Sequence, residues 1–177
     1  MTSFLRHLIA FLALPFVMTV LIPLSMLRGS RSTPLAFDAM GRFTPYAIGV
    51  LLFVVGLSLF SSSLFNFVTR GRGTLAPWDP PKNLVVAGPY RHVRNPMISG
   101  VIFILFAEGF LFQSRSLLLW AVTFLLINAI YIPLFEEPTL ADRFGDPYRE
   151  YCRHVPALRS EASSLAKRRL AAMRRER

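Results

Sequence analysis

The sequence predicts an all-α integral membrane protein with about four transmembrane helices and a helical cap on the cytoplasmic side. Hydrophobic residues make up 53% of the chain, and they gather in long runs with almost no charge. A transmembrane helix needs roughly 20 such residues. The net charge is +10, and the basic residues lie between and after the runs, as expected for loops beside anionic lipid. We expect no nucleic-acid partner, because the apolar runs are too long for a soluble nucleic-acid-binding domain.

Four runs are long enough to cross a bilayer as helices, which satisfy their own backbone hydrogen bonds in lipid. In chain order they cover Leu8 to Leu27, Phe43 to Thr69, Pro96 to Ser114 and Ser116 to Phe135. The first run follows Arg6, as a signal peptide would. It is longer than a typical signal core and no small-x-small cleavage site ends it, so a retained span is predicted.

Two features inside the runs predict packing or function. Gly49 and Gly56 share a face of the second run and predict close helix packing. Glu108 is the one charged residue of the third run. An intramembrane carboxylate is either functional or a protonated packing residue that is hydrogen-bonded, and the sequence leaves both interpretations open.

The placement of Lys and Arg predicts an orientation. Residues 70–95 and 141–177 carry more basic side chains than residues 28–42 and the tight hairpin at 113–116. The positive-inside bias therefore predicts that both termini are cytoplasmic. On this topology, the stretch that leads into the third helix and everything after Phe135 emerge on the same cytoplasmic face.

Asn95 and Pro96 predict the start of the third helix, because Asn is a good N-cap and Pro is favoured at the first helical position. Arg91, His92 and Arg94 precede this start, where the helix dipole disfavours cations. Their placement indicates an anion at the same end. Either an anionic group of a cofactor or lipid headgroups would satisfy them.

Glu136 and Glu137 follow the fourth run, where the C-terminal end of a helix disfavours acidic residues. They form either a solvated helix end or the partners of a positive group, for which Arg91, Arg94 and a cationic ligand are the candidates. Basic groups at one helix end and carboxylates at the neighbouring end would together suit a zwitterion, which offers a carboxylate and an ammonium.

The residues after this point predict a helical cap. Leu140 to Tyr151 predicts a short helix, a stop at Gly145, and an amphipathic helix from Asp146. Tyr148 lies three residues before Tyr151 and shares its face. That face either packs on the membrane surface or roofs a pocket.

The stretch from Lys82 to Pro156 resembles the isoprenylcysteine carboxyl methyltransferase and phospholipid methyltransferase family of integral membrane enzymes. The resemblance rests on Gly-x-Tyr, Arg-x-Pro, Glu-Glu, Phe-Gly-x-x-Tyr-x-x-Tyr and Val-Pro in step along the chain. The matching residues are Gly88, Tyr90, Arg94, Pro96, Glu136, Glu137, Leu140, Phe144, Gly145, Tyr148, Tyr151, Val155 and Pro156.

This resemblance implies S-adenosylmethionine as the cofactor, with its ammonium on Glu136 and its carboxylate at the start of the third helix. Tyr90, Arg94 and Glu137 are the candidates for catalytic residues. The expected cofactor-binding residues are Asn83, Leu84, Val85, Gly88, Tyr90, Arg94, Asn95, Pro96, Met97, Ile98 and Glu136.

Two departures from the family bear on the substrate. Asn95 stands where well-known members have His, and an amide cannot serve as a charged base. Ile132 stands where prenylcysteine enzymes carry a substrate-contacting Arg, so prenylcysteine is not expected. We expect a lipophilic small molecule or a lipid with a carboxylate, amine or thiol acceptor.

Other functions stay open at this point. The C-terminal part of NADPH-dependent sterol reductases is similar to this family, and a non-enzymatic membrane scaffold would also suit the chain. We expect a membrane domain over residues 1–159 and a basic tail over 160–177 that contacts anionic headgroups. With one cysteine, Cys152, and three scattered histidines, neither a disulfide nor a metal site is expected.

Overall fold

A computed structural model describes residues 12–29, 43–71 and 83–155, and the elements in these ranges are helical. Leu8 to Phe11 of the first predicted span, Lys82, Pro156 and the basic tail lie outside them. In chain order the elements are η1 (Leu12–Leu21), α2 (Ile22–Gly29), α3 (Phe43–Asn66), η2 (Phe67–Gly71), η3 (Gly88–Arg91), α4 (Pro96–Leu111), α5 (Arg115–Tyr131), η4 (Ile132–Glu136), α6 (Glu137–Phe144) and α7 (Asp146–His154).

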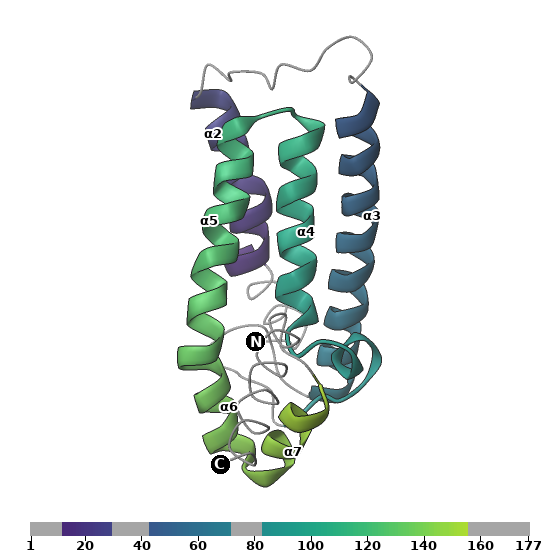
Figure 1. The fold of residues 1–177 in the computed structure, drawn as a ribbon, viewed down its shortest axis with the longest axis vertical. Helices are drawn as coiled ribbons and strands as arrows, with labels where there is room; N and C mark the ends of the chain where they lie inside the picture. Colours follow the sequence, from purple (N-terminus) through teal and green to yellow (C-terminus); the bar gives the residue numbers. More distant parts are fainter. Residues whose placement is uncertain (1–11, 30–42, 72–82, 156–177) are drawn as a thin grey trace, which may run out of the picture.

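The bundle is arranged around α4, which packs against α3, α5 and η1 (Figure 1). Its contact with α3 depends on glycines, because a Cβ atom on Gly56 would lie 2.8 Å from the carbonyl oxygen of Gly100. A Cβ atom on Gly49 would lie 2.8 Å from the side chain of Leu111. The prediction that Gly49 and Gly56 mark close helix packing is therefore confirmed.

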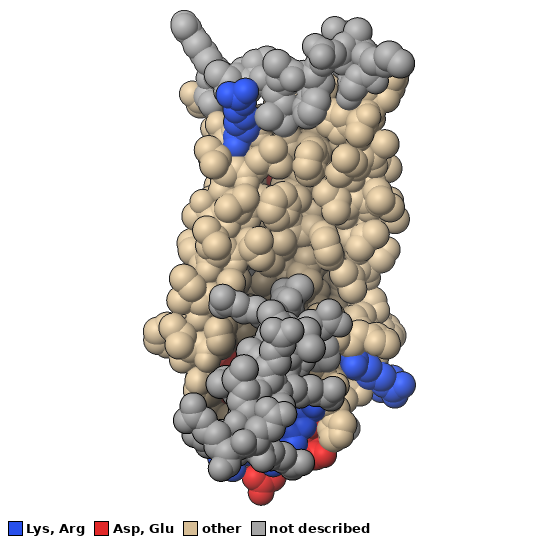
Figure 2. Space-filling model, in the orientation of Figure 1, with Lys and Arg blue, Asp and Glu red and all other residues tan. Residues whose placement is uncertain are grey.

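Two helical runs are long and apolar enough to cross a membrane, Phe43–Gly71 with 29 residues and Arg115–Phe144 with 30. Only 22% and 17% of their most apolar windows are buried, whereas the core helix of a soluble protein is mostly buried. Pro15–Gly29 and Pro96–Leu111 are apolar but shorter. Figure 2 shows a wide band with very little charge on the visible face, and most of the visible charged side chains lie toward the two ends. These exposed apolar surfaces indicate a lipid environment.

The helices alternate in direction, so that two groups of segments gather at opposite ends of the bundle (Figure 1). The turn between α4 and α5 lies at one end, with the end of α2 and the start of α3. Residues 83–95, α6 and α7 lie at the other end. The predicted proximity of the stretch before α4 and the residues after Phe135 is confirmed for residues 136–155, and the rest of the tail lies outside the described residues.

The turns follow the sequence signals closely. Gln113 has a φ of 48°, and the Ser114 side chain caps α5 by accepting a hydrogen bond from the Leu117 N–H at 3.4 Å. Gly145 has a φ of 63° and separates α6 from α7, as predicted. The short helix expected from Leu140 instead begins at Glu137.

A π-helical turn, η4, joins α5 to α6 without a break. Pro133 has no N–H to donate within the helix. The N–H of Glu137 bonds to the carbonyl of Ile132, five residues back. The wider turn sets the direction in which Glu136 and Glu137 project, and such turns are frequent at functional sites.

Candidate functional site

Asn95 is the N-cap of α4 and also contacts the end of η4. Its side-chain oxygen accepts a hydrogen bond from the N–H of Ile98 at 3.4 Å, and Pro96 occupies the first helical position. The predicted helix start is therefore confirmed. The amide nitrogen of Asn95 is directed to the carboxylate of Glu136 and lies 3.1 Å from each of its oxygens.

This contact joins the start of α4 to the end of η4, within the long apolar run Arg115–Phe144. Glu136 is half-buried, and Asn95 is the side chain that contacts its carboxylate in the described part of the chain. A carboxylate can accept about four hydrogen bonds, so Glu136 keeps capacity for a cationic partner.

Tyr90 lies in the same cluster. Burial raises the pKa of its hydroxyl above the usual value, and electrostatic interactions with Tyr151 and Glu136 raise it further. The hydroxyl therefore stays protonated and can donate a hydrogen bond at neutral pH. The structure thus places Asn95 in contact with Glu136 and Tyr90 close enough to be affected by the charge of Glu136. That these residues bind a cofactor stays a prediction.

Arg94 makes three contacts within the protein. Its Nε donates to the carbonyl of Val155 and its Nη2 to the carbonyl of Cys152, both at 2.7 Å. Its Nη1 forms an ion pair with Glu137 at 2.9 Å. These carbonyls belong to the C-terminal end of α7, where a helix favours a cation. Arg94 thus fastens α7 to the start of α4; its expected contact with a cofactor stays a prediction.

The paired tyrosines of α7 face inward. The Tyr151 hydroxyl donates to the carbonyls of Tyr90 at 2.7 Å and Val93 at 3.4 Å. Burial raises the pKa of Tyr151 to about 12, which keeps this donor protonated. Tyr148 and Tyr151 form a buried cluster with Val155, against which Leu84 packs. The shared face therefore covers residues 84–94.

Gly88 fits a position that other residues could not occupy without strain. Its φ is 58°, and a Cβ atom there would lie 2.6 Å from the side-chain nitrogen of Asn66. Asn66 is buried at the end of α3 and was not among the predicted site residues. In the sequence, Asn66 is the one amide side chain in the second apolar run, and this was the signal that could have singled it out.

The other predicted cofactor-binding residues lie in three different environments: exposed, buried in the loop before α4, and packed against the core of the bundle. The Asn83 side chain is exposed and donates to the carbonyl of Arg70 at 3.3 Å. Val85 is buried. Met97 and Ile98 pack against the core between α3, α4 and α5. The structure therefore gathers only part of the set at Glu136.

A groove of about 370 Å³ opens beside the Arg94–Glu137 pair. Its walls come from η4, α6 and α7, and its lining residues are Arg94, Pro133, Glu137, Pro138, Ala141, Tyr148, Arg149 and Cys152. This groove connects the ion pair with the surface of the cap.

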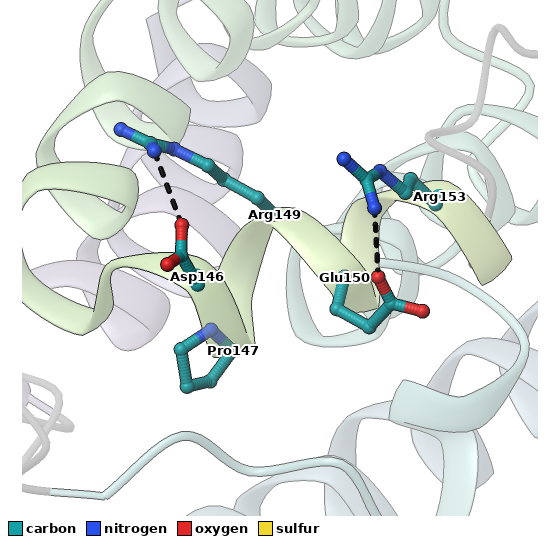
Figure 3. Close-up of a pocket in the computed structure, with 5 residues that line it drawn as sticks. All are labelled: Asp146, Pro147, Arg149, Glu150 and Arg153. Carbon is teal, nitrogen blue, oxygen red and sulfur yellow. Dashed lines mark hydrogen bonds and ion pairs between the residues drawn. The ribbon is translucent and has the colours of Figure 1, made fainter.

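A second hollow lies on the outer face of α7 (Figure 3). Arg149 pairs with Asp146 at 3.2 Å and Arg153 with Glu150 at 3.0 Å, and all four side chains are more than half exposed. Exposed pairs of this kind contribute about 0–1 kcal/mol. This surface is a solvated helix face.

Two further observations concern charged groups. In the described ranges, no three His, Cys, Asp or Glu side chains lie close enough to hold a metal ion. Glu108 is half-buried in α4, and its Oε2 has no hydrogen-bond partner among the residues that the structure describes.

Comparison with known proteins assigns a family. The family model for phospholipid methyltransferase matches residues 44–147, which include α3 to α6 and all of Tyr90, Asn95 and Glu136. This match extends further toward the N-terminus than the resemblance seen in the sequence. No curated protein and no solved structure matches the chain. Since the match covers more than half of the sequence, the chain belongs to the phospholipid methyltransferase family.

Proposed function

We propose that this protein is a membrane-embedded methyltransferase that uses S-adenosylmethionine to methylate a lipophilic small molecule or a lipid. Family membership supports the reaction and the methyl donor. The exposed apolar helices support insertion in a membrane. In this proposal four helices cross the bilayer, and the end that carries α6 and α7 faces the cytoplasm, as does the basic tail over 160–177.

The contact between Asn95 and Glu136 is the observation that carries the proposal. S-adenosylmethionine has a carboxylate, an ammonium and a sulfonium. Glu136 offers a half-buried carboxylate with spare acceptor capacity, and the start of α4 offers the N-terminal end of a helix for an anion. These residues fit the zwitterionic part of the donor. When bound, the donor would supply the methyl group of its sulfonium, and the rest of the donor would leave as a neutral thioether.

The protein itself aligns the reactants and excludes water. The Tyr90 hydroxyl stays protonated and is available as a hydrogen-bond donor. The Tyr151 hydroxyl donates to the carbonyl of Tyr90, so that α7 covers the segment that leads into α4. Asn95 cannot remove a proton from an acceptor. An amine acceptor must lose a proton before attack, whereas a carboxylate acceptor needs no base. Ile132 in place of Arg argues against prenylcysteine.

The direct test is binding of S-adenosylhomocysteine to the purified chain in detergent, measured by titration calorimetry. Glu136→Ala is expected to weaken binding by about tenfold or more, because the ammonium loses its charged partner. Glu150→Ala, at an exposed glutamate on the outer face of α7, is the matched control and should bind like the wild type. Equal affinity of Glu136→Ala and the wild type would contradict the role of Glu136.

Activity separates the proposal from its alternatives. Radiolabelled methyl transfer into a lipid extract is expected for the methyltransferase. Reduction that depends on NADPH would indicate a sterol-reductase-like enzyme, and the absence of both would indicate a scaffold.

A further inference from the structure

Two neighbouring residues before α4 pair with two neighbouring residues at the junction of η4 and α6. Asn95 bonds to Glu136 at 3.1 Å, and Arg94 forms an ion pair with Glu137 at 2.9 Å. The two carboxylates therefore have different partners, one a neutral amide and the other a guanidinium.

The charge of Arg94 is balanced where it lies. Its side chain is 18% exposed and that of Glu137 is 22% exposed, so water screens the pair only in part. The other donors of Arg94 engage the carbonyls of Cys152 and Val155. Glu137 therefore balances the positive charge of Arg94. Glu136 bonds to the neutral amide of Asn95, which does not balance the negative charge of this carboxylate.

We propose that Glu137 is a positioning residue that holds the guanidinium of Arg94 in an ion pair, so that the carboxylate of Glu136 stays free for a cationic ligand. This inference rests on the proposed function. An unpaired guanidinium in a partly buried place is unfavourable. Without Glu137, the adjacent carboxylate of Glu136 becomes the available partner for Arg94, and the guanidinium then competes with the ammonium of the methyl donor.

The test is a double-mutant cycle on the full chain in detergent, with S-adenosylhomocysteine as the probe. Glu137→Gln is expected to weaken binding by about tenfold in the wild-type background. In the Glu136→Gln background the same substitution should cause no further loss, because it acts through Glu136. Glu150→Gln, on the outer face of α7, is the matched control and should leave binding unchanged. Thermal unfolding of each variant reports whether it is folded.

A conservative variant supplies a second measurement. Glu137→Asp keeps the charge and is expected to bind within about threefold of the wild type. This variant also carries the test if Glu137→Gln does not fold.

The possible failures are distinct. A loss of equal size in both backgrounds, no loss in the wild-type background, or no recovery with Glu137→Asp would overturn the positioning role alone. A wild-type chain that does not bind the probe would overturn the proposed function, and this inference with it.

Discussion

The side chain of Asn95 bonds in two directions, and this explains how one residue serves both a helix and a site. Its oxygen caps α4 at the N–H of Ile98, while its nitrogen reaches Glu136. An aspartate would cap the helix equally well, but it would place a second carboxylate beside Glu136. The amide is therefore the group that satisfies both contacts.

Asn95→Ala is expected to lower the free energy of unfolding by about 1 kcal/mol through loss of the cap. It should also weaken binding of S-adenosylhomocysteine, because the carboxylate of Glu136 loses the donor that orients it. Ser114→Ala removes the corresponding cap of α5 at the opposite end of the bundle. This control should lose similar stability and keep its affinity, as measured by chemical unfolding and calorimetry. Equal affinities of the two variants would contradict a role for Asn95 in binding.

At the scale of helices, the contact of α3 with α4 depends on close approach of their backbones. A Cβ atom on Gly100 would lie 2.8 Å from the carbonyl oxygen of Gly56 and 2.8 Å from the backbone nitrogen of Phe60. Both neighbours are backbone atoms, so a methyl group can be accommodated only if the helices move apart.

Gly100→Ala is accordingly expected to destabilise the protein by about 1–3 kcal/mol. Gly29→Ala is the matched control, because no atom of the residues that the structure describes lies within 4 Å of a Cβ atom at that position. Thermal unfolding in detergent measures both. A melting temperature for Gly100→Ala equal to that of the control would show that the two helices are not in close contact.

The helix boundaries were predictable because their signals are local. Asn95 before Pro96, the hairpin at Ser114 and the stop at Gly145 each depend on neighbours in sequence, and all three are confirmed. The composition of the runs likewise predicted an all-helical chain. Local capping and turn chemistry suffice for such boundaries.

The partners of the charged residues were predictable only in part. The sequence indicated Arg94 as one candidate partner of the two glutamates, and its ion pair with Glu137 is confirmed. Nothing near Arg94 indicates that it bonds to carbonyls 58 and 61 residues away. Asn95 contacts Glu136 and Arg94 contacts Glu137 because of the π-helical turn at Pro133. This turn rotates both carboxylates relative to their positions in a regular helix. Such pairings are set by how helices pack, which periodicity does not encode.

For the molecule as a whole, the orientation in the membrane is the main prediction. Cys152 is the one cysteine of the chain, it is half-buried, and it lies in α7 at the end that carries the site. Labelling with a membrane-impermeant maleimide therefore reports which side that end faces.

We expect labelling in inside-out vesicles and little labelling in right-side-out vesicles, because the site is predicted to be cytoplasmic. Cys152→Ser should remain unlabelled in both and controls for non-specific reaction. The reverse pattern would place the site on the opposite side of the membrane and would contradict the orientation predicted from the Lys and Arg distribution.

The Arg94–Glu137 and Asn95–Glu136 contacts also bear on biosynthesis. These contacts close the open end of a hairpin made by consecutive helices, and Asn95 and Glu136 are 41 positions apart in the sequence. Contacts of short sequence separation form with little loss of chain entropy. Both partners of the Asn95–Glu136 contact are present once the ribosome has released Glu136, before α7 has been synthesised. Assembly of this end of the protein can therefore begin during insertion, with α7 added last.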